Sequence, residues 1–213
     1  MDILFAPRPQ PALTVSDETA LYPVSRIFCI GRNYAAHAAE MGNEIDRERP
    51  FFFTKSSHHL AQTGAIQPYP AGTEDYHHEV ELVVALGNEL SHADPEAAME
   101  AVFGYGVGLD MTRRDLQAVA KKAGRPWDAA KDVEGSAVIG PLTRAGEFGA
   151  PGPQEIALDV NGEIRQRAPL SDMIWSVGEL LAFLSTLYVL APGDLLGRET
   201  VRQATESDVL TTG

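Results

Sequence analysis

The 213-residue sequence has almost no cysteine: Cys29 is the single example, so an internal disulfide bond is excluded. Cys29 lies in the apolar run 26–30 (RIFCI), where a lone thiol is typical of a small core residue. A chain without disulfides suits a reducing compartment, and we therefore expect a cytoplasmic protein.

Basic residues are also scarce, with 17 Lys and Arg against 30 Asp and Glu and a formal net charge of −13. This balance argues against nucleic acid as a partner and against docking on anionic membranes. The longest apolar run, 180–190, is too short to cross a bilayer. The first ten residues lack the basic start and apolar core of a secretory signal, so we expect none.

The hydrophobic content of 44% is enough to bury the core of one domain. We expect residues 1–20, which contain three prolines, to be an extension that packs on the surface or reaches a partner subunit. Residues 21–213 then form a single catalytic domain. The sequence predicts strands at 26–30, 50–55, 80–86 and 105–110, helices at 34–41, 95–102, 112–122 and 177–187, and a hairpin over 156–166.

These strands do not alternate regularly with helices, which argues against a doubly wound sheet. The order favours an α+β fold built on a mixed β-sheet that forms a roll or sandwich, with short helices. Asn161-Gly162 marks the hairpin turn, and Thr112 with Asp115 is typical of a helix capping box.

Two glutamates interrupt an apolar strand in the stretch YHHEVELVVAL. Glu79 and Glu81 are two residues apart, so in a strand they project from the same face. Val83 and Ala85 continue that face, which indicates that it is buried. Two buried carboxylates are costly unless a cation neutralises them, and oxygen ligands favour Mg²⁺, Mn²⁺ or Ca²⁺. The alternative is an edge strand whose glutamates face water.

Three further features can carry chemistry, each with a plainer alternative. Asp110 ends the strand-like segment GYGVGLD and is the best candidate for a third metal ligand, or else a turn or helix-start aspartate. His37 and Glu40 are three residues apart on the expected helix, where they form either a proton-accepting dyad or an exposed surface pair. Lys131 follows an apolar Trp-Ala-Ala stretch and either holds an anion or is simply solvated.

Six segments, in this order, resemble the fumarylacetoacetate hydrolase family: FCIGRNYAAHAAEMG, PFFFTK, YHHEVELVVALG, GYGVGLDMTRRDLQ, KKAGRPWDAAK and VNGEIRQ. The resemblance implies a mixed β-roll, a homodimer, and Mg²⁺ or Mn²⁺, with Ca²⁺ as a substitute in a crystal. It assigns the metal ligands as Glu79, Glu81 and Asp110, the catalytic residues as His37, Glu40 and Lys131, and the substrate-binding residues as Arg32, Arg114 and Gln117.

The activity implied by this resemblance is metal-dependent hydrolysis of a C–C bond in a 2,4-diketo acid. Our first choice of substrate is fumarylpyruvate, cleaved to fumarate and pyruvate. Alternatives within the family are an oxaloacetate decarboxylase or a keto–enol tautomerase. The sequence departs from the family pattern at Ser56, at Val138 and after Leu196, which motivates a further alternative, a catalytically impaired relative that binds metal.

Overall fold

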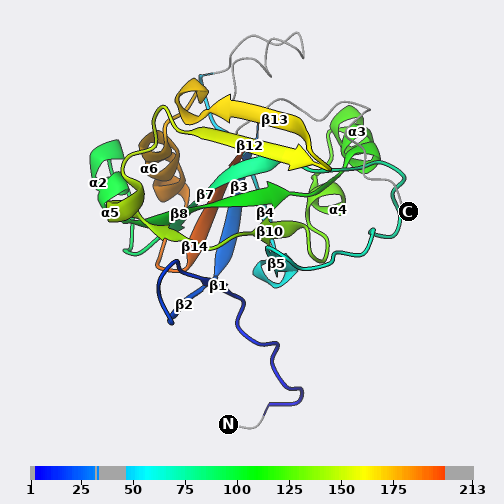
Figure 1. Cartoon of the computed structure of the whole chain (residues 1–213), viewed down its shortest axis with the longest axis horizontal. Helices are drawn as coiled ribbons and strands as arrows, with labels where there is room; N and C mark the ends of the chain where they lie inside the picture. Colours follow the sequence, from blue (N-terminus) through cyan, green and yellow to red (C-terminus); the bar gives the residue numbers. More distant parts are fainter. Residues whose placement is uncertain (1–2, 32, 34–46, 200–213) are drawn as a thin grey trace.

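A mixed β-sheet dominates the computed structural model, which describes residues 3–31, 33 and 47–199 (Figure 1). Its strands follow the order β4-β3-β14-β7-β8-β10-β5, and β11 pairs with β8 at one end. The pairs β3–β14 and β5–β10 are parallel, whereas β3–β4, β7–β14, β7–β8 and β8–β10 are antiparallel. The sheet strands are β3 (Arg26–Gly31), β4 (Phe51–Lys55), β5 (Leu60–Gln62), β7 (Val80–Leu86), β8 (Val102–Asp110), β10 (Ala137–Ile139), β11 (Thr143–Arg144) and β14 (Asp194–Glu199).

Three smaller antiparallel pairs and several short helices surround this sheet. The pairs are β1 (Ala12–Thr14) with β2 (Leu21–Pro23), β6 (Tyr76–His77) with β9 (Thr112–Arg113), and β12 (Glu155–Val160) with β13 (Glu163–Pro169). The helices are η1 (Ser57–His59), α2 (Pro95–Glu100), α3 (Arg114–Ala123), α4 (Asp128–Lys131), α5 (Ala145–Phe148), η2 (Leu170–Asp172) and α6 (Val177–Leu187). No helix among the described residues is long and apolar enough to span a membrane.

Strand alternation gives the sheet two apolar faces. On β7, Val80, Leu82 and Val84 pack into one core with α2 and α6, while Val83 and Ala85 pack into a second core. On β3, Cys29 joins the second core. The period-2 pattern that the sequence predicts for β7 is therefore confirmed, and the face it assigns to Glu81 is the face of the second core.

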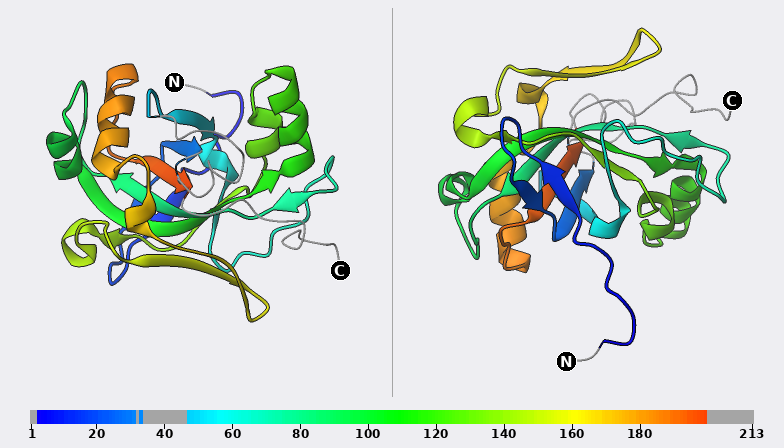
Figure 2. Two further views of the ribbon diagram at one scale, coloured as in Figure 1. Left: turned by 90° about the horizontal axis from the view of Figure 1, so that it is seen from above. Right: turned by 60° about the horizontal axis from the view of Figure 1, so that its bottom comes forward.

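The hairpin forms as the sequence predicts. Asn161 and Gly162 both have positive φ, 56° and 86°, the conformation of a type I′ turn that Asn-Gly favours. The β12–β13 ribbon runs along the sheet and projects beyond it (Figure 2). Its only deeply buried residues among the described strand positions are Ile156 and Gln166, so the rest of the ribbon is more open.

Two sequence predictions need correction. Strand β8 begins at Val102, three residues earlier than expected, because α2 ends at Glu100. The capping box expected at Thr112 and Asp115 is wrong: α3 begins at Arg114, and Asp115 instead accepts hydrogen bonds from Thr73 Oγ1 and the Glu74 amide. The helix expected at 34–41 lies outside the described residues.

The segment 1–20 has two parts where it is described. Ile3, Leu4 and Phe5 are exposed, and the chain leads away from the body at this end (Figure 1). Leu13, in contrast, is fully buried in the second core, and β1 pairs with β2. The division into an extension and a catalytic domain stays a prediction.

Candidate active site

Three acidic side chains converge where β7 and β8 run side by side. Glu81 lies on β7 opposite Gly108 of β8, and the Asp110 amide donates to the Glu79 carbonyl at 2.8 Å. Each of the three acids is at most 4% exposed. The expectation of a buried face is therefore met, and the alternative of a water-facing edge strand is not. Asp110 is the last residue of β8 and not part of a turn or the start of a helix.

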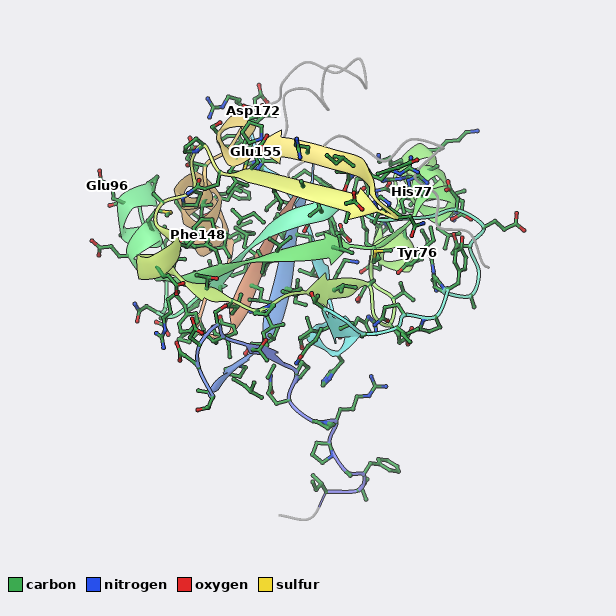
Figure 3. The ribbon with its side chains drawn as sticks, viewed as in Figure 1. Tyr76, His77, Glu96, Phe148, Glu155 and Asp172 are labelled. Atoms are coloured by element: carbon green, nitrogen blue, oxygen red, sulfur yellow. The ribbon has the colours of Figure 1, made fainter. Side chains whose placement is uncertain are left out.

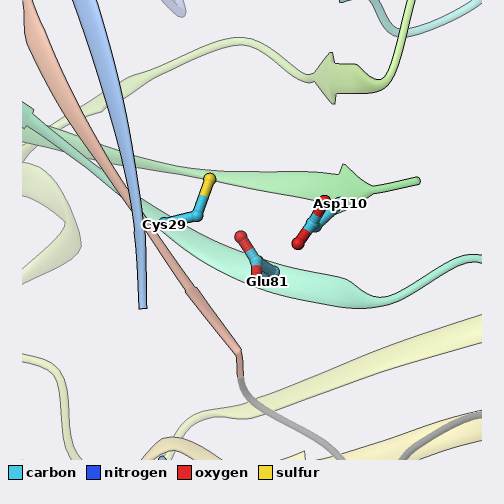
Figure 4. Close-up of side chains that lie close together, drawn as sticks. All are labelled: Cys29, Glu81 and Asp110. Carbon is cyan, nitrogen blue, oxygen red and sulfur yellow. The ribbon is translucent and has the colours of Figure 1, made fainter. Parts of the chain in front are cut away.

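Glu81 and Asp110 also meet Cys29, which comes from β3 (Figure 4). One ligand atom from each residue lies within 4.8 Å of the other two. Strand β14 separates β3 from β7, and at this level it carries Gly197, opposite Cys29. A Cβ atom at position 197 would lie 2.6 Å from Glu81 Oε2, so a glycine here leaves room for the carboxylate.

Lys131 bridges two of the acids. Its Nζ atom lies 2.6 Å from Glu79 Oε2 and 2.5 Å from Asp110 Oδ2, and the residue is 2% exposed. Burial opposes the charged form, but the carboxylates of Asp110 and Glu79 outweigh it and raise the pKa of Lys131. The solvated-lysine alternative is therefore excluded, and Lys131 is a buried cation at neutral pH.

Glu79 also pairs with a second cation. Besides Lys131, Arg114 Nη2 lies 2.5 Å from Glu79 Oε1, and Arg114 Nη1 donates to Gln117 Oε1 at 2.6 Å. Burial alone would raise the pKa of Glu79, but the charges of Lys131 and Arg114 hold it well below its usual value of 4.5. The first turn of α3 thus brings two predicted substrate-binding residues, Arg114 and Gln117, to the acids.

Lys55 completes the cluster, although sequence reasoning missed it. Its Nζ atom lies 2.8 Å from Asp110 Oδ1, donates to Ser136 Oγ at 2.9 Å and to the Met111 carbonyl at 3.1 Å, and also contacts the Lys131 carbonyl. The sequence does indicate its position: in PFFFTK, Lys55 is two residues after Phe53 and four after Phe51, so all three side chains lie on the same face of the strand.

The donor set fits a hard divalent cation. Asp110 Oδ1 receives no hydrogen bond of adequate geometry, although the Lys55 ammonium is close, so it keeps lone pairs for a metal. A cavity of about 20 Å³ adjoins Cys29, Lys55, Glu81 and Asp110, which is room for one ion or water molecule. Carboxylate oxygens suit Mg²⁺ or Mn²⁺. Glu79 takes part in the cluster, but its oxygens already contact Lys131 and Arg114.

Not every predicted site residue can be placed. Arg32, His37 and Glu40 lie outside the described residues, so their roles stay predictions. Among the residues that are described, the structure brings together Glu79, Glu81, Asp110, Arg114, Gln117 and Lys131, and it adds Lys55 and Cys29. Burial and the nearby Asp110 and Glu81 carboxylates raise the pKa of the Cys29 thiol well above its usual value, so Cys29 is neutral there.

The family model for the C-terminal region of fumarylacetoacetate (FAA) hydrolase matches residues 26–211, which is most of the chain. The chain belongs to the fumarylacetoacetate hydrolase family. Family membership and the mixed-sheet fold predicted from the sequence are thereby confirmed.

Named relatives within the family differ in activity. The chain is 45% identical over 162 residues to a fumarylpyruvate hydrolase of Ralstonia sp, covering 73% of this chain and 82% of that protein. It is 40% identical to the oxaloacetate tautomerase YcgM of Escherichia coli K12, covering 82% and 80%. A solved fumarylpyruvate hydrolase from Pseudomonas aeruginosa, in complex with Mn²⁺ and pyruvate, superposes with a TM-score of 0.88 at 45% identity and covers 96% of this chain and 91% of that one.

Proposed function

We propose that this protein is a divalent-metal-dependent hydrolase of acylpyruvates, with fumarylpyruvate as its first substrate. The observation that carries the proposal is the buried cluster in which Lys131 bridges Glu79 and Asp110, with Glu81 beside them. The similarity to two fumarylpyruvate hydrolases at 45% identity supports this choice of substrate.

Glu81 and Asp110 would hold the Mg²⁺ or Mn²⁺ ion, which would supply Lewis-acid polarisation of the substrate oxygens. Glu79 is the third predicted ligand, and its oxygens would have to be shared with Lys131 and Arg114. Lys55 fixes one oxygen of Asp110, and Arg114 fixes one oxygen of Glu79, so the carboxylates keep their orientation without moving. This preorganisation lowers the cost of binding a ligand that carries two oxygen donors, such as the carboxylate and 2-oxo group of a diketo acid.

The chemical step needs a base and a cation. In our proposal, His37, oriented by Glu40, takes a proton from water, and the resulting hydroxide adds to the 4-carbonyl carbon. The bond between C3 and C4 then breaks, releasing fumarate and the enolate of pyruvate, which takes up one proton. Lys131 is held protonated beside this site, so it can stabilise the negative charge that develops on the leaving enolate.

A product assay tests this proposal. Purified protein with Mn²⁺ or Mg²⁺ should consume fumarylpyruvate and release fumarate and pyruvate in equal amounts, and a chelator should stop the reaction. Loss of substrate without fumarate would refute hydrolysis.

An oxaloacetate tautomerase or decarboxylase is the second candidate, and the 40% identical relative favours the tautomerase. Either reaction would use the same buried Lys131 and carboxylates, but it would not cleave an acyl group from the substrate. Oxaloacetate should then show an accelerated enol–keto change, or release of carbon dioxide, while fumarylpyruvate stays intact. If metal raises the melting temperature and neither acid is consumed, the impaired metal-binding relative is the correct reading.

We also propose that the protein is a homodimer. A cavity of about 1270 Å³ with mainly apolar walls lies between β8, β10 and β12, and none of the clustered acids or lysines lines it. Three of its lining residues are labelled in Figure 3: Tyr76, Phe148 and Glu155. Val107 in this cavity is 50% exposed, and a second copy would cover it. The cytoplasmic location stays a prediction.

A further inference from the structure

Three aromatic side chains form a continuous wall next to the acidic cluster. Phe51 and Phe53 come from β4, and Trp127 immediately precedes α4. The ring centroids of Phe51 and Trp127 are 4.7 Å apart, and those of Phe53 and Trp127 are 5.8 Å apart. Phe51 is 36% exposed and Trp127 is half-buried, so both side chains reach the protein surface.

The inner end of the aromatic wall touches the site. Lys131 Nζ, which holds Asp110 and Glu79, lies 5.0 Å from the ring centroid of Phe53. The register of β3 and β4 places Phe53 opposite Cys29, so Phe53 lies on the sheet face that carries the acidic cluster. A molecule bound at the cluster therefore has the aromatic wall beside it.

The outer end of the aromatic wall carries a second cation. Lys121 Nζ, on the last turn of α3, lies 5.1 Å from the ring centroid of Trp127. The adjoining segment 121–128 has three Lys and Arg but only one Asp, in a chain where acids outnumber bases 30 to 17. This local excess of positive charge would attract an anion toward the outer end.

We propose that the wall of Phe51, Phe53 and Trp127 receives the acyl arm of the substrate, and that Lys121 selects arms ending in a carboxylate. The inference rests on the proposed hydrolase function and specifies its substrate class. A planar, conjugated acyl arm packs face-on against aromatic rings, and a terminal carboxylate pairs with an ammonium group. Oxaloacetate has no acyl arm and would leave the aromatic wall unused.

Substrate discrimination tests the role of Lys121. In Lys121→Met, the ratio of kcat/KM for fumarylpyruvate to kcat/KM for acetylpyruvate, which lacks the distal carboxylate, should fall about tenfold. The matched control is Lys122→Met, which removes an exposed neighbouring charge and should leave the ratio as it is. An equal loss for both substrates, or the same ratio change in the control, would overturn the proposal.

Fluorescence tests the aromatic wall independently of turnover. The chain has two tryptophans, so Trp175→Phe leaves Trp127 as the single reporter. Fumarate should quench this emission in the Mn²⁺-loaded protein, and adding Lys121→Met should weaken the apparent fumarate affinity about tenfold. No quenching by fumarate, or no effect of Lys121→Met, would refute the subsite. If fumarylpyruvate and acetylpyruvate are both left intact, the proposed function fails while this measurement still decides the subsite.

Discussion

Replacing Lys131 by methionine would test whether this ammonium neutralises the buried acids. The substitution keeps the length of the side chain and removes its charge. Lys131 lies within 2.6 Å of both Glu79 and Asp110, and all three residues are at most 4% exposed. Removing one partner of a buried ion pair costs about 3–5 kcal/mol, because the remaining charge is left uncompensated.

The expected loss is smaller here, because Arg114 still pairs with Glu79 and Lys55 still pairs with Asp110. We expect the free energy of unfolding of the metal-free protein to fall by about 2–3 kcal/mol. For a chain of this size, that corresponds to a drop in melting temperature of about 5–10 °C.

Metal should reverse much of this loss, since a divalent cation can neutralise the same carboxylates. In calorimetry or fluorescence-monitored melting, Mn²⁺ should therefore raise the melting temperature of Lys131→Met more than that of the wild type. Lys122→Met, at an exposed position, is the matched control and should change neither value. A melting temperature for Lys131→Met within 1 °C of wild type, or an Mn²⁺ response no larger than that of the wild type, would refute the reasoning.

Four further predictions follow from the site and the cavity. The pKa of Glu79 in the folded state lies below its usual value of 4.5, so the ionised carboxylate stabilises the fold above that pH, and this stabilisation is lost as the pH falls further. The free energy of unfolding of the metal-free protein, measured in urea, should therefore decrease from pH 5 to pH 3. Gly197→Ala should displace the Glu81 carboxylate and weaken Mn²⁺ binding at least about tenfold in calorimetric titration. The melting temperature should change little, because the added methyl group clashes only with the end of a flexible side chain. His37→Ala should abolish hydrolysis yet keep the Mn²⁺-dependent rise in melting temperature; loss of both would contradict a role confined to proton transfer. Val107→Asp should convert the proposed dimer to a monomer in light scattering, and a dimer mass that stays unchanged would contradict an interface at Val107.

Local patterns in the sequence were sufficient for several features. The period-2 alternation of β7 assigned Val83 and Ala85 to the face of Glu81, and Asn161-Gly162 placed the hairpin turn. Both depend on residues close together in the chain, whose geometry is set by backbone sterics. The capping box predicted at Thr112 is wrong, because α3 begins at Arg114 and the Asp115 side chain accepts a hydrogen bond from Thr73, which is distant in the sequence.

Only the tertiary structure decided which side chains meet. The sheet order places β14 between β3 and β7, and thereby brings Cys29, Gly197 and Glu81 together from segments more than fifty residues apart. It also brings Lys55 to Asp110, so a strand residue that no sequence motif singles out is a counter-ion of the site. Strand order and register depend on hydrogen bonds and packing between distant segments, and no local pattern encodes these pairings. The sequence thus determined which residues could carry charge into the core, and the folded sheet decided which of those charges compensate one another.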